Sequence, residues 1–174
     1  MRYRNKSLRP QILSWLLFVS STLVSQFVWS MDADRLNQLK VAYVYNFTKF
    51  IEWKNTELNN FDVCLNIRNE DLAKEFSKLT AKGLRIRRIE NDDTTTNDWR
   101  ECHIIYLDSP LSLASDSIRT FPDALIISEV KDESAQIYFT LINNKLRFSI
   151  GRDRAEQAGL SISSKLLRLA HEVY

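Results

Sequence analysis

Three short apolar runs, separated by stretches with helical features, constrain the fold of this 174-residue chain most strongly. They cover residues 61–67, 102–107 and 124–128, and the last two are almost entirely apolar. Runs of this kind are typical of strands that are buried on both faces. Strands that alternate with helices imply right-handed crossovers and a mostly parallel sheet. A fourth, more charged strand is predicted over residues 84–89.

Helices are predicted before and between these strands. Asn69 or Asp71 is expected to cap a short helix over residues 72–79, and another helix is expected over residues 111–120. Residues 34–53 show apolar positions at spacings of three and four, which is typical of a helix with one face in the core. The positions in this stripe are Leu36, Leu39, Tyr43, Phe47, Phe50 and Ile51.

The pattern changes in the last third of the chain. Residues 135–142 and 145–150 are predicted to form a hairpin, because Asn143-Asn144 between them tolerates the positive φ of a two-residue turn. Helices are expected over residues 151–158 and 161–173. The predicted fold is a single α/β domain with a mostly parallel central sheet, an antiparallel hairpin and helices on both faces.

The first 30 residues are predicted to be a signal peptide outside this fold. A basic start without acidic residues precedes an apolar stretch from Ile12 to Trp29, and Ser30 suits cleavage before Met31. An uncleaved membrane anchor is the alternative, although the stretch is near the lower limit of ~17 residues for spanning a bilayer and carries several polar side chains. We therefore expect export to the periplasm, with residues 31–174 as the domain.

Removal of the signal peptide changes the charge balance. The whole chain has 24 Lys and Arg against 22 Asp and Glu, a net charge of +2. Four of the basic residues and none of the acidic ones lie in residues 1–30, so 20 basic residues face 22 acidic ones in the remainder, a net charge of −2. A nucleic-acid partner is not expected, because such binding needs a basic surface.

The sequence shows no catalytic constellation, and we expect neither an enzyme nor a cofactor. Glycine-rich phosphate loops, nucleophile elbows and zinc-protease motifs are all missing from the sequence. With two Cys and two His in the chain, a four-ligand zinc site is not expected. Cys102 and His103 are adjacent, but neighbouring residues of a strand point to opposite faces, so a nucleophile–base pair is disfavoured.

The two cysteines suggest a disulfide. Cys64 lies in the first predicted strand and Cys102 opens the third, and such strands are commonly neighbours in a doubly wound sheet. An exported chain meets an oxidising compartment, which favours pairing. Two buried free thiols are the alternative, and a structural bridge is preferred over a redox switch because the sequence indicates neither exposure nor strain.

Five segments of the chain resemble the YfiR family of exported bacterial proteins. Together they extend across about residues 36–173, which is nearly all of the chain after the signal peptide. The segments are residues 39–53 (LKVAYVYNFTKFIEW), 61–65 (FDVCL), 102–107 (CHIIYL), 146–150 (LRFSI) and 158–170 (AGLSISSKLLRLA).

The resemblance implies a periplasmic α/β domain without known enzymatic activity. The best-understood members of the family restrain an inner-membrane diguanylate cyclase by contacting its periplasmic part, which lowers cyclic-di-GMP and disfavours biofilm. Cys64 and Cys102 match the positions of a family disulfide. A second cysteine pair that some members carry nearer the C-terminus is missing here, which argues against a redox role that depends on it. Residues 129–133 are more charged than in the family pattern.

Two kinds of binding site are predicted. The leading hypothesis is a regulatory binding module whose partner surface is formed by Leu160, Ile162, Leu166 and Arg168. The alternative is a small-ligand sensor, or an adaptor for another membrane system. For a sensor, Asn69, Asp108 and Glu129 follow strand ends, where parallel sheets bind ligands. Self-association into a homodimer stays open.

Overall fold

A computed structural model describes the part of the chain that carries the predicted strands. Contacts within the chain separate Met1–Leu36 from Asn37–Tyr174, and the sheet belongs to the second of these units. The predicted signal peptide and the predicted helix over residues 111–120 lie outside the described residues. The described ranges are residues 33–54, 61–89, 99–109, 123–131 and 133–174.

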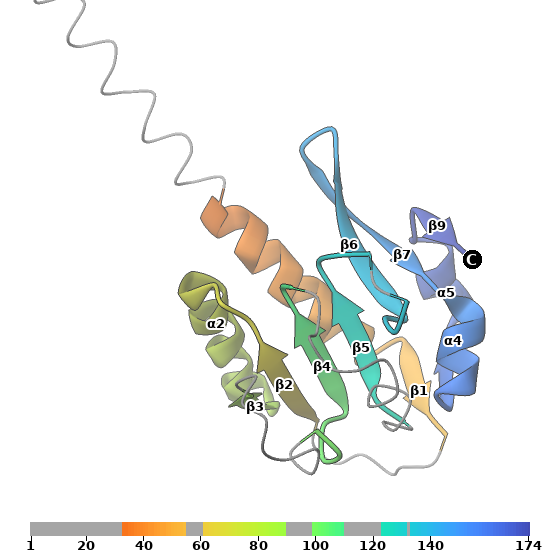
Figure 1. Cartoon of the computed structure of the whole chain (residues 1–174), viewed down its shortest axis with the longest axis horizontal. Helices are drawn as coiled ribbons and strands as arrows, with labels where there is room; N and C mark the ends of the chain where they lie inside the picture. The colour runs from red at the N-terminus through yellow and green to blue at the C-terminus, as the bar shows by residue number, and fades with distance from the viewer. Residues whose placement is uncertain (1–32, 55–60, 90–98, 110–122, 132) are drawn as a thin grey trace, which may run out of the picture. The chain divides into compact units, whose positions relative to one another are not determined.

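A seven-stranded sheet forms the centre of the second unit (Figure 1). Five neighbouring strands run parallel, and the last of them begins an antiparallel hairpin, so the predicted mostly parallel sheet with a hairpin is confirmed. A two-residue strand then joins the hairpin in parallel. In spatial order the strands are β3 (Arg85–Arg88), β2 (Asp62–Asn66), β4 (Ile104–Leu107), β5 (Leu125–Ser128), β6 (Ile137–Ile142), β7 (Lys145–Ile150) and β9 (Glu172–Val173).

The central strands form where the apolar runs predicted them. Every residue of β2, β4 and β5 is buried, as expected for strands covered on both faces. The crossover from β2 to β3 contains α2 (Glu70–Ser77) and the 3₁₀ helix η1 (Lys78–Lys82). Asn69 caps α2 by accepting a hydrogen bond from the Leu72 amide, and Gly83 ends η1 at φ 87°, a conformation that glycine adopts without strain.

The hairpin also follows the prediction from sequence. Asn143 and Asn144 join β6 to β7 at φ 51° and 57°, the left-handed values that a two-residue turn of type I′ requires. The register pairs Phe139 with Phe148 across the two strands.

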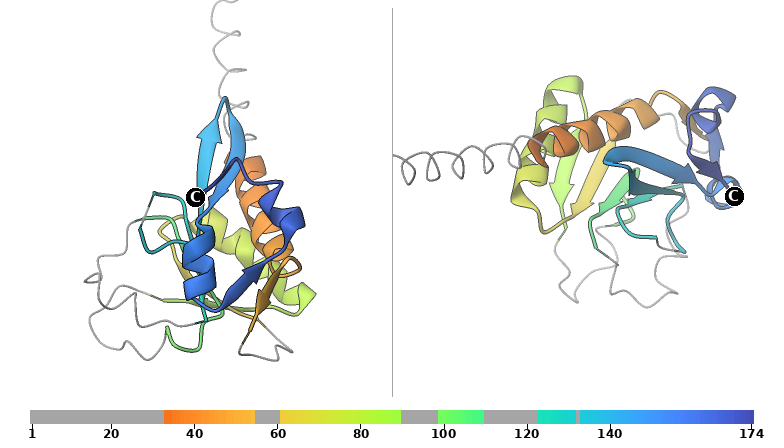
Figure 2. Two further views of the ribbon diagram at one scale, coloured as in Figure 1. Left: turned by 90° about the vertical axis from the view of Figure 1, so that its right-hand side faces the viewer. Right: turned by 90° about the horizontal axis from the view of Figure 1, so that it is seen from above.

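The two faces of the sheet have different cores. Residues 37–47 of the first helix and α2 both lie against one face, as the view from above shows (Figure 2). Aromatic contacts hold both helices against the sheet. The ring centroids of Phe47 and Phe148 are 5.2 Å apart, and those of Phe76 in α2 and Tyr106 are 4.8 Å apart. The opposite face carries a cluster around Cys64, Trp99, Cys102, Ile105, Leu107, Ala124, Ile126 and Ala135.

The first helix is shorter than predicted, and its buried stripe is shifted. It ends at residue 47, and the buried positions are Asn37, Lys40, Val41, Val44 and Phe47, whereas Leu39 is 43% exposed. The prediction from sequence assigned only apolar side chains to the buried face of this helix. The structure instead buries Lys40, because its ammonium group is paired with Glu129.

Two segments predicted to be helical form strands that pair with each other. Residues Ile51–Trp53 form β1, which pairs antiparallel with β8 (Leu160–Ile162). The prediction of a helix to residue 53 is therefore wrong, and so is the prediction of one helix over residues 161–173. The burial of β1 alternates as in a strand, and Gly159 at φ 72° turns the chain into β8.

The C-terminal region otherwise contains short elements. α4 (Arg152–Gln157) confirms the predicted helix after the hairpin. A single turn, α5 (Ser164–Leu167), is capped by Ser163 and leads to β9. Among the residues that the structure describes, no helix is both long enough and apolar enough to cross a membrane.

Candidate functional site

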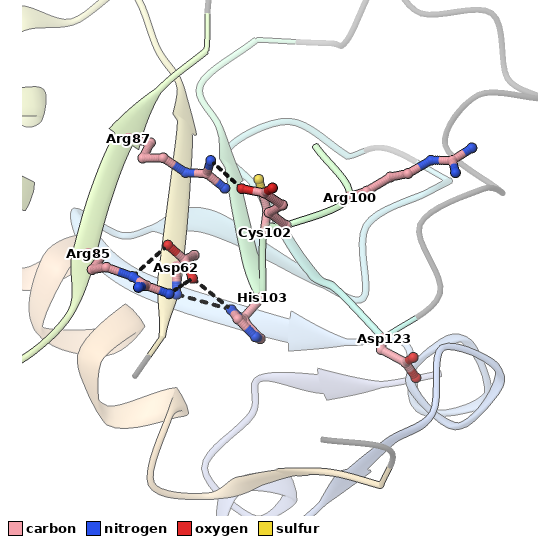
Figure 3. Close-up of a pocket in the computed structure, with 8 residues that line it drawn as sticks. Asp62, Arg85, Arg87, Arg100, Cys102, His103 and Asp123 are labelled. Atoms are coloured by element: carbon pink, nitrogen blue, oxygen red, sulfur yellow. Dashed lines mark hydrogen bonds and ion pairs between the residues drawn. The ribbon is translucent and has the colours of Figure 1, made fainter. Parts of the chain in front are cut away.

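A polar hollow of the described surface lies at the amino ends of the parallel strands (Figure 3). It is an open cleft of about 540 Å³ beside the starts of β2, β3, β4 and β5. Three arginines and three carboxylates surround it, together with one histidine and one half of the disulfide. The lining residues are Asp62, Arg85, Arg87, Arg100, Glu101, Cys102, His103 and Asp123.

Asp62 forms hydrogen bonds with two other residues of the cleft, Arg85 and His103. Asp62 and Arg85 are register neighbours on β2 and β3, so Arg85 grips the carboxylate with two parallel bonds, one of them from Nε to Oδ1 at 2.9 Å. The Asp62 amide donates to His103 Nδ1 at 3.1 Å, and the His103 amide donates back to the Asp62 carbonyl at 2.9 Å. This exchange fixes the imidazole against the start of β2.

The imidazole at this position favours its neutral form. Burial lowers the pKa of His103, because removal of water disfavours the charged ring, while the Asp62 carboxylate opposes this shift. Arg85 and Arg87 add to the lowering of the pKa. The carboxylate of Asp62 in turn raises the pKa of Arg85 through its hydrogen bond and its charge.

Arg87 occupies the position on β3 next to Cys64 of β2. Its Nη1 donates to Glu101 Oε2 at 3.0 Å, and the Glu101 side chain is 75% exposed. Its Nε and Nη2 are buried and have no hydrogen-bond partner among the described residues. Arg100 lines the same cleft but extends away from Arg87 (Figure 3).

A disulfide joins Cys64 to Cys102 on neighbouring strands. Their Cα atoms are 5.8 Å apart, and both residues are buried, at 0% and 5% exposure. The pairing agrees with the prediction from strand order and with the family resemblance. Neither sulfur is a thiol, so Cys102 cannot serve His103 as a nucleophile in this state. Within the described residues, no cluster of three potential ligands could hold a metal ion.

The predicted ligand residues Asn69 and Asp108 lie together at the opposite, carboxyl end of the strands. Asp108 Oδ2 accepts hydrogen bonds from the amides of Arg68 and Asn69, at 2.6 and 3.2 Å. Asn69 uses its side-chain oxygen to cap α2. Both side chains therefore hold the β2–α2 loop in place.

Glu129 lies in a second network at that end. Its carboxylate accepts two bonds from Lys40 Nζ at 2.8 Å and one from the Tyr106 hydroxyl at 2.7 Å. Burial and the neighbouring carboxylate raise the pKa of Tyr106 well above its usual range. Glu129 also lines a mostly apolar groove of about 520 Å³ against the hairpin, beside Val130 and Leu141.

The four residues predicted to contact a partner separate into two groups. Leu160 and Leu166 are 0% and 3% exposed and belong to the core, so their side chains lie outside any partner surface of the folded protein. Ile162 is partly exposed and Arg168 is exposed. The neighbouring Leu169 is 61% exposed.

The amino-end cleft was missed by reasoning from sequence. Two of its three arginines come from the LRIRRI strand, where Arg85 and Arg87 alternate with Ile86. That alternation placed both arginines on one side of a strand, which was a usable signal. Their acidic partners Asp62 and Glu101 are distant in sequence. The parallel register of β2 and β3 places Asp62 opposite Arg85, and the segment before β4 brings Glu101 to Arg87.

Comparison with solved structures supports the fold. A conserved domain protein from Vibrio cholerae O1 biovar El Tor matches with a TM-score of 0.53 at 11% identity, covering 77% of this chain and 60% of that one. The ABC domain in complex with L-Trp from Streptococcus pneumonia matches with a TM-score of 0.50 at 13% identity, covering 79% and 62%. The chain thus spans about three fifths of the length of each, and at these identities the likeness concerns the fold alone.

Comparison with protein families is more specific. A search of curated proteins finds no significant match. The sequence model of the family DUF4154, described as YfiR/HmsC-like, matches residues 37–171. This range contains every strand of the sheet except the last, both cysteines and the cleft. The chain therefore belongs to the YfiR/HmsC-like family.

Proposed function

We propose that this protein is a periplasmic regulator without enzymatic activity that binds the periplasmic part of an inner-membrane diguanylate cyclase and restrains it. Binding lowers cyclic-di-GMP signalling and biofilm formation. The family match over residues 37–171 is the observation that carries the proposal. The Cys64–Cys102 disulfide agrees with an oxidising compartment.

The arrangement of the cleft is also compatible with a role other than catalysis. The Nδ1 atom of His103 accepts a backbone hydrogen bond, and the sulfur of Cys102 is part of a disulfide. Asp62 is engaged by Arg85. These groups hold one another in place, and none of them is a nucleophile next to a base.

The partner surface is proposed around Ile162 and Arg168, with Leu169 beside them. Exposed apolar side chains that the core does not use are a common feature of docking surfaces. Leu169 meets that condition at 61% exposure. Its neighbour Arg168 adds a charge that can select an acidic partner.

The first test is the cyclic-di-GMP level of cells with and without this gene. Deletion is expected to raise it, and an unchanged level with the protein expressed and exported contradicts the proposal. Complementation then locates the surface: Arg168→Glu with Leu169→Ser should fail to restore the low level. Leu141→Ser is the control, because Leu141 is a similarly exposed leucine, at 58%, that lies on β6 and outside the proposed surface. The purified variants must keep the thermal stability of the wild type.

A further inference from the structure

Arg87 holds a pair of buried hydrogen-bond donors that the described residues leave without an acceptor. These are Nε and Nη2, which point the same way on one edge of the guanidinium. A buried donor without an acceptor is unfavourable because it has lost its hydrogen bonds to water, so a partner for these atoms would be stabilising.

The same cleft shows what such a partner looks like. Arg85, two residues earlier on β3, uses the equivalent Nε and Nη2 atoms to grip both oxygens of Asp62. A carboxylate or phosphate group fits this fork because two of its oxygens match the two parallel N–H bonds. Arg87 presents the same pair of donors, Nε and Nη2, in the same cleft, but no carboxylate of the described residues binds this pair.

Glu101 is placed to compete with a ligand for Arg87. It binds only Nη1 of Arg87, at 3.0 Å, and its side chain is 75% exposed. An ion pair so exposed contributes little to stability because solvent screens it, so it opens readily. Because Nε and Nη2 are covered, an oxyanion reaches them only after the guanidinium turns, and release from Glu101 permits that turn.

We infer that the amino-end cleft is a binding site for a small solute with a carboxylate or phosphate group, which Arg87 holds through Nε and Nη2 in competition with Glu101. The cleft volume of about 540 Å³ lies within the range of small-ligand sites. His103 and Cys102 form the wall beside the bound group. The inference is independent of the proposed function, since it concerns binding by the isolated protein.

The test measures the thermal stability of the purified, oxidised protein against sodium acetate or inorganic phosphate, with sodium chloride at matched ionic strength. At least one of the two oxyanions should raise the melting temperature of the wild type beyond the chloride control, and should raise that of Arg87→Lys less, because general stabilisation by an excluded salt acts equally on both proteins. The preferred probe identifies the ligand chemistry, acetate for a carboxylate and phosphate for a phosphate group. A response that follows ionic strength alone overturns the inference.

Variants then assign the response to Arg87. Arg87→Lys keeps the charge but removes the fork, and should weaken binding about tenfold. Glu101→Gln should strengthen it several-fold, which a merely structural role of Arg87 does not produce. Arg88→Gln on the same strand is the control, because Arg88 pairs with Glu70 outside the cleft, and it should leave binding unchanged. Equal affinity of the wild type, Arg87→Lys and Glu101→Gln overturns the assignment, and isothermal titration checks it if a variant has altered stability.

Discussion

The two ends of the parallel sheet use charged side chains in different ways. At the carboxyl end, Asp108 Oδ2 binds two loop amides, and the Glu129 carboxylate binds Lys40 and Tyr106. These acidic groups hold local structure together. At the amino end, Asp62 is similarly engaged, but Arg87 retains two donors without a described acceptor. The comparison shows that the position of a carboxylate at a strand end does not by itself indicate a ligand site, because local structure can use one of its oxygens first. At Asp108 the other oxygen, Oδ1, is buried without a partner among the described residues.

The largest expected effect comes from removing the disulfide near the amino ends of the parallel strands. Replacing Cys64 and Cys102 together by Ala should lower the free energy of unfolding by about 4 kcal/mol, because the bridge closes a loop with a sequence separation of 38 residues. Urea denaturation of the oxidised proteins measures the difference. Reductant should destabilise the wild type by a similar amount and leave the double variant unaffected. A loss below about 1 kcal/mol would show that the bridge contributes little to the fold.

A smaller effect is expected from breaking the network at the carboxyl end. Lys40→Met leaves the Glu129 carboxylate partly buried without its cation, the two side chains being 10% and 22% exposed. Loss of one partner of a fully buried pair costs about 3–5 kcal/mol, and the residual exposure and the Tyr106 bond should reduce this to about 2 kcal/mol. Chemical denaturation again provides the measurement.

Two controls sharpen that result. Lys40→Met combined with Glu129→Leu removes both charges and should recover much of the loss, since no buried charge then stays unpaired. Arg152→Met breaks an ion pair whose side chains are 59% and 53% exposed and should change stability by at most about 0.5 kcal/mol. If Lys40→Met costs no more than Arg152→Met, the network at the carboxyl end is not structural.

Reasoning from sequence succeeded where local pattern decides the structure. The buried strands β2, β4 and β5 follow from apolar runs, and the hairpin follows from Asn143-Asn144. The Cys64–Cys102 pairing could be anticipated because strand order made β2 and β4 neighbours. Each of these depends on a signal contained within a few residues, or on a general rule of parallel sheets.

Reasoning from sequence failed where a residue or strand that is distant in the sequence determines the structure. β1 and β8 are separated by about a hundred residues, and each forms a strand because it pairs with the other. Lys40 is buried only because the chain brings Glu129 to it. The cleft depends on the register that places Arg85 opposite Asp62. None of these partners can be identified from the local sequence.

The smallest expected effect concerns the pH dependence of the amino end. Burial lowers the pKa of His103 below the value near 6.5 that an unfolded chain gives it. As the pH falls through about 6.5, the unfolded chain therefore takes up a proton before the folded protein does, and the free energy of unfolding decreases until the pH reaches the lowered folded pKa. This loss should be smaller than either effect above, and denaturation at a series of pH values between about 7 and 4 measures it.

The source of this pH dependence can be isolated by substitution. His103→Asn keeps a side-chain oxygen near the position of Nδ1, so it can still accept the bond from the Asp62 amide, but it cannot take up a proton. The variant should therefore lose part of the decrease in stability below pH 6.5. His171→Asn is the control, because His171 is exposed and outside the cleft, and it should leave the decrease unchanged. If His103→Asn keeps the full pH dependence of the wild type, protonation of His103 does not account for it.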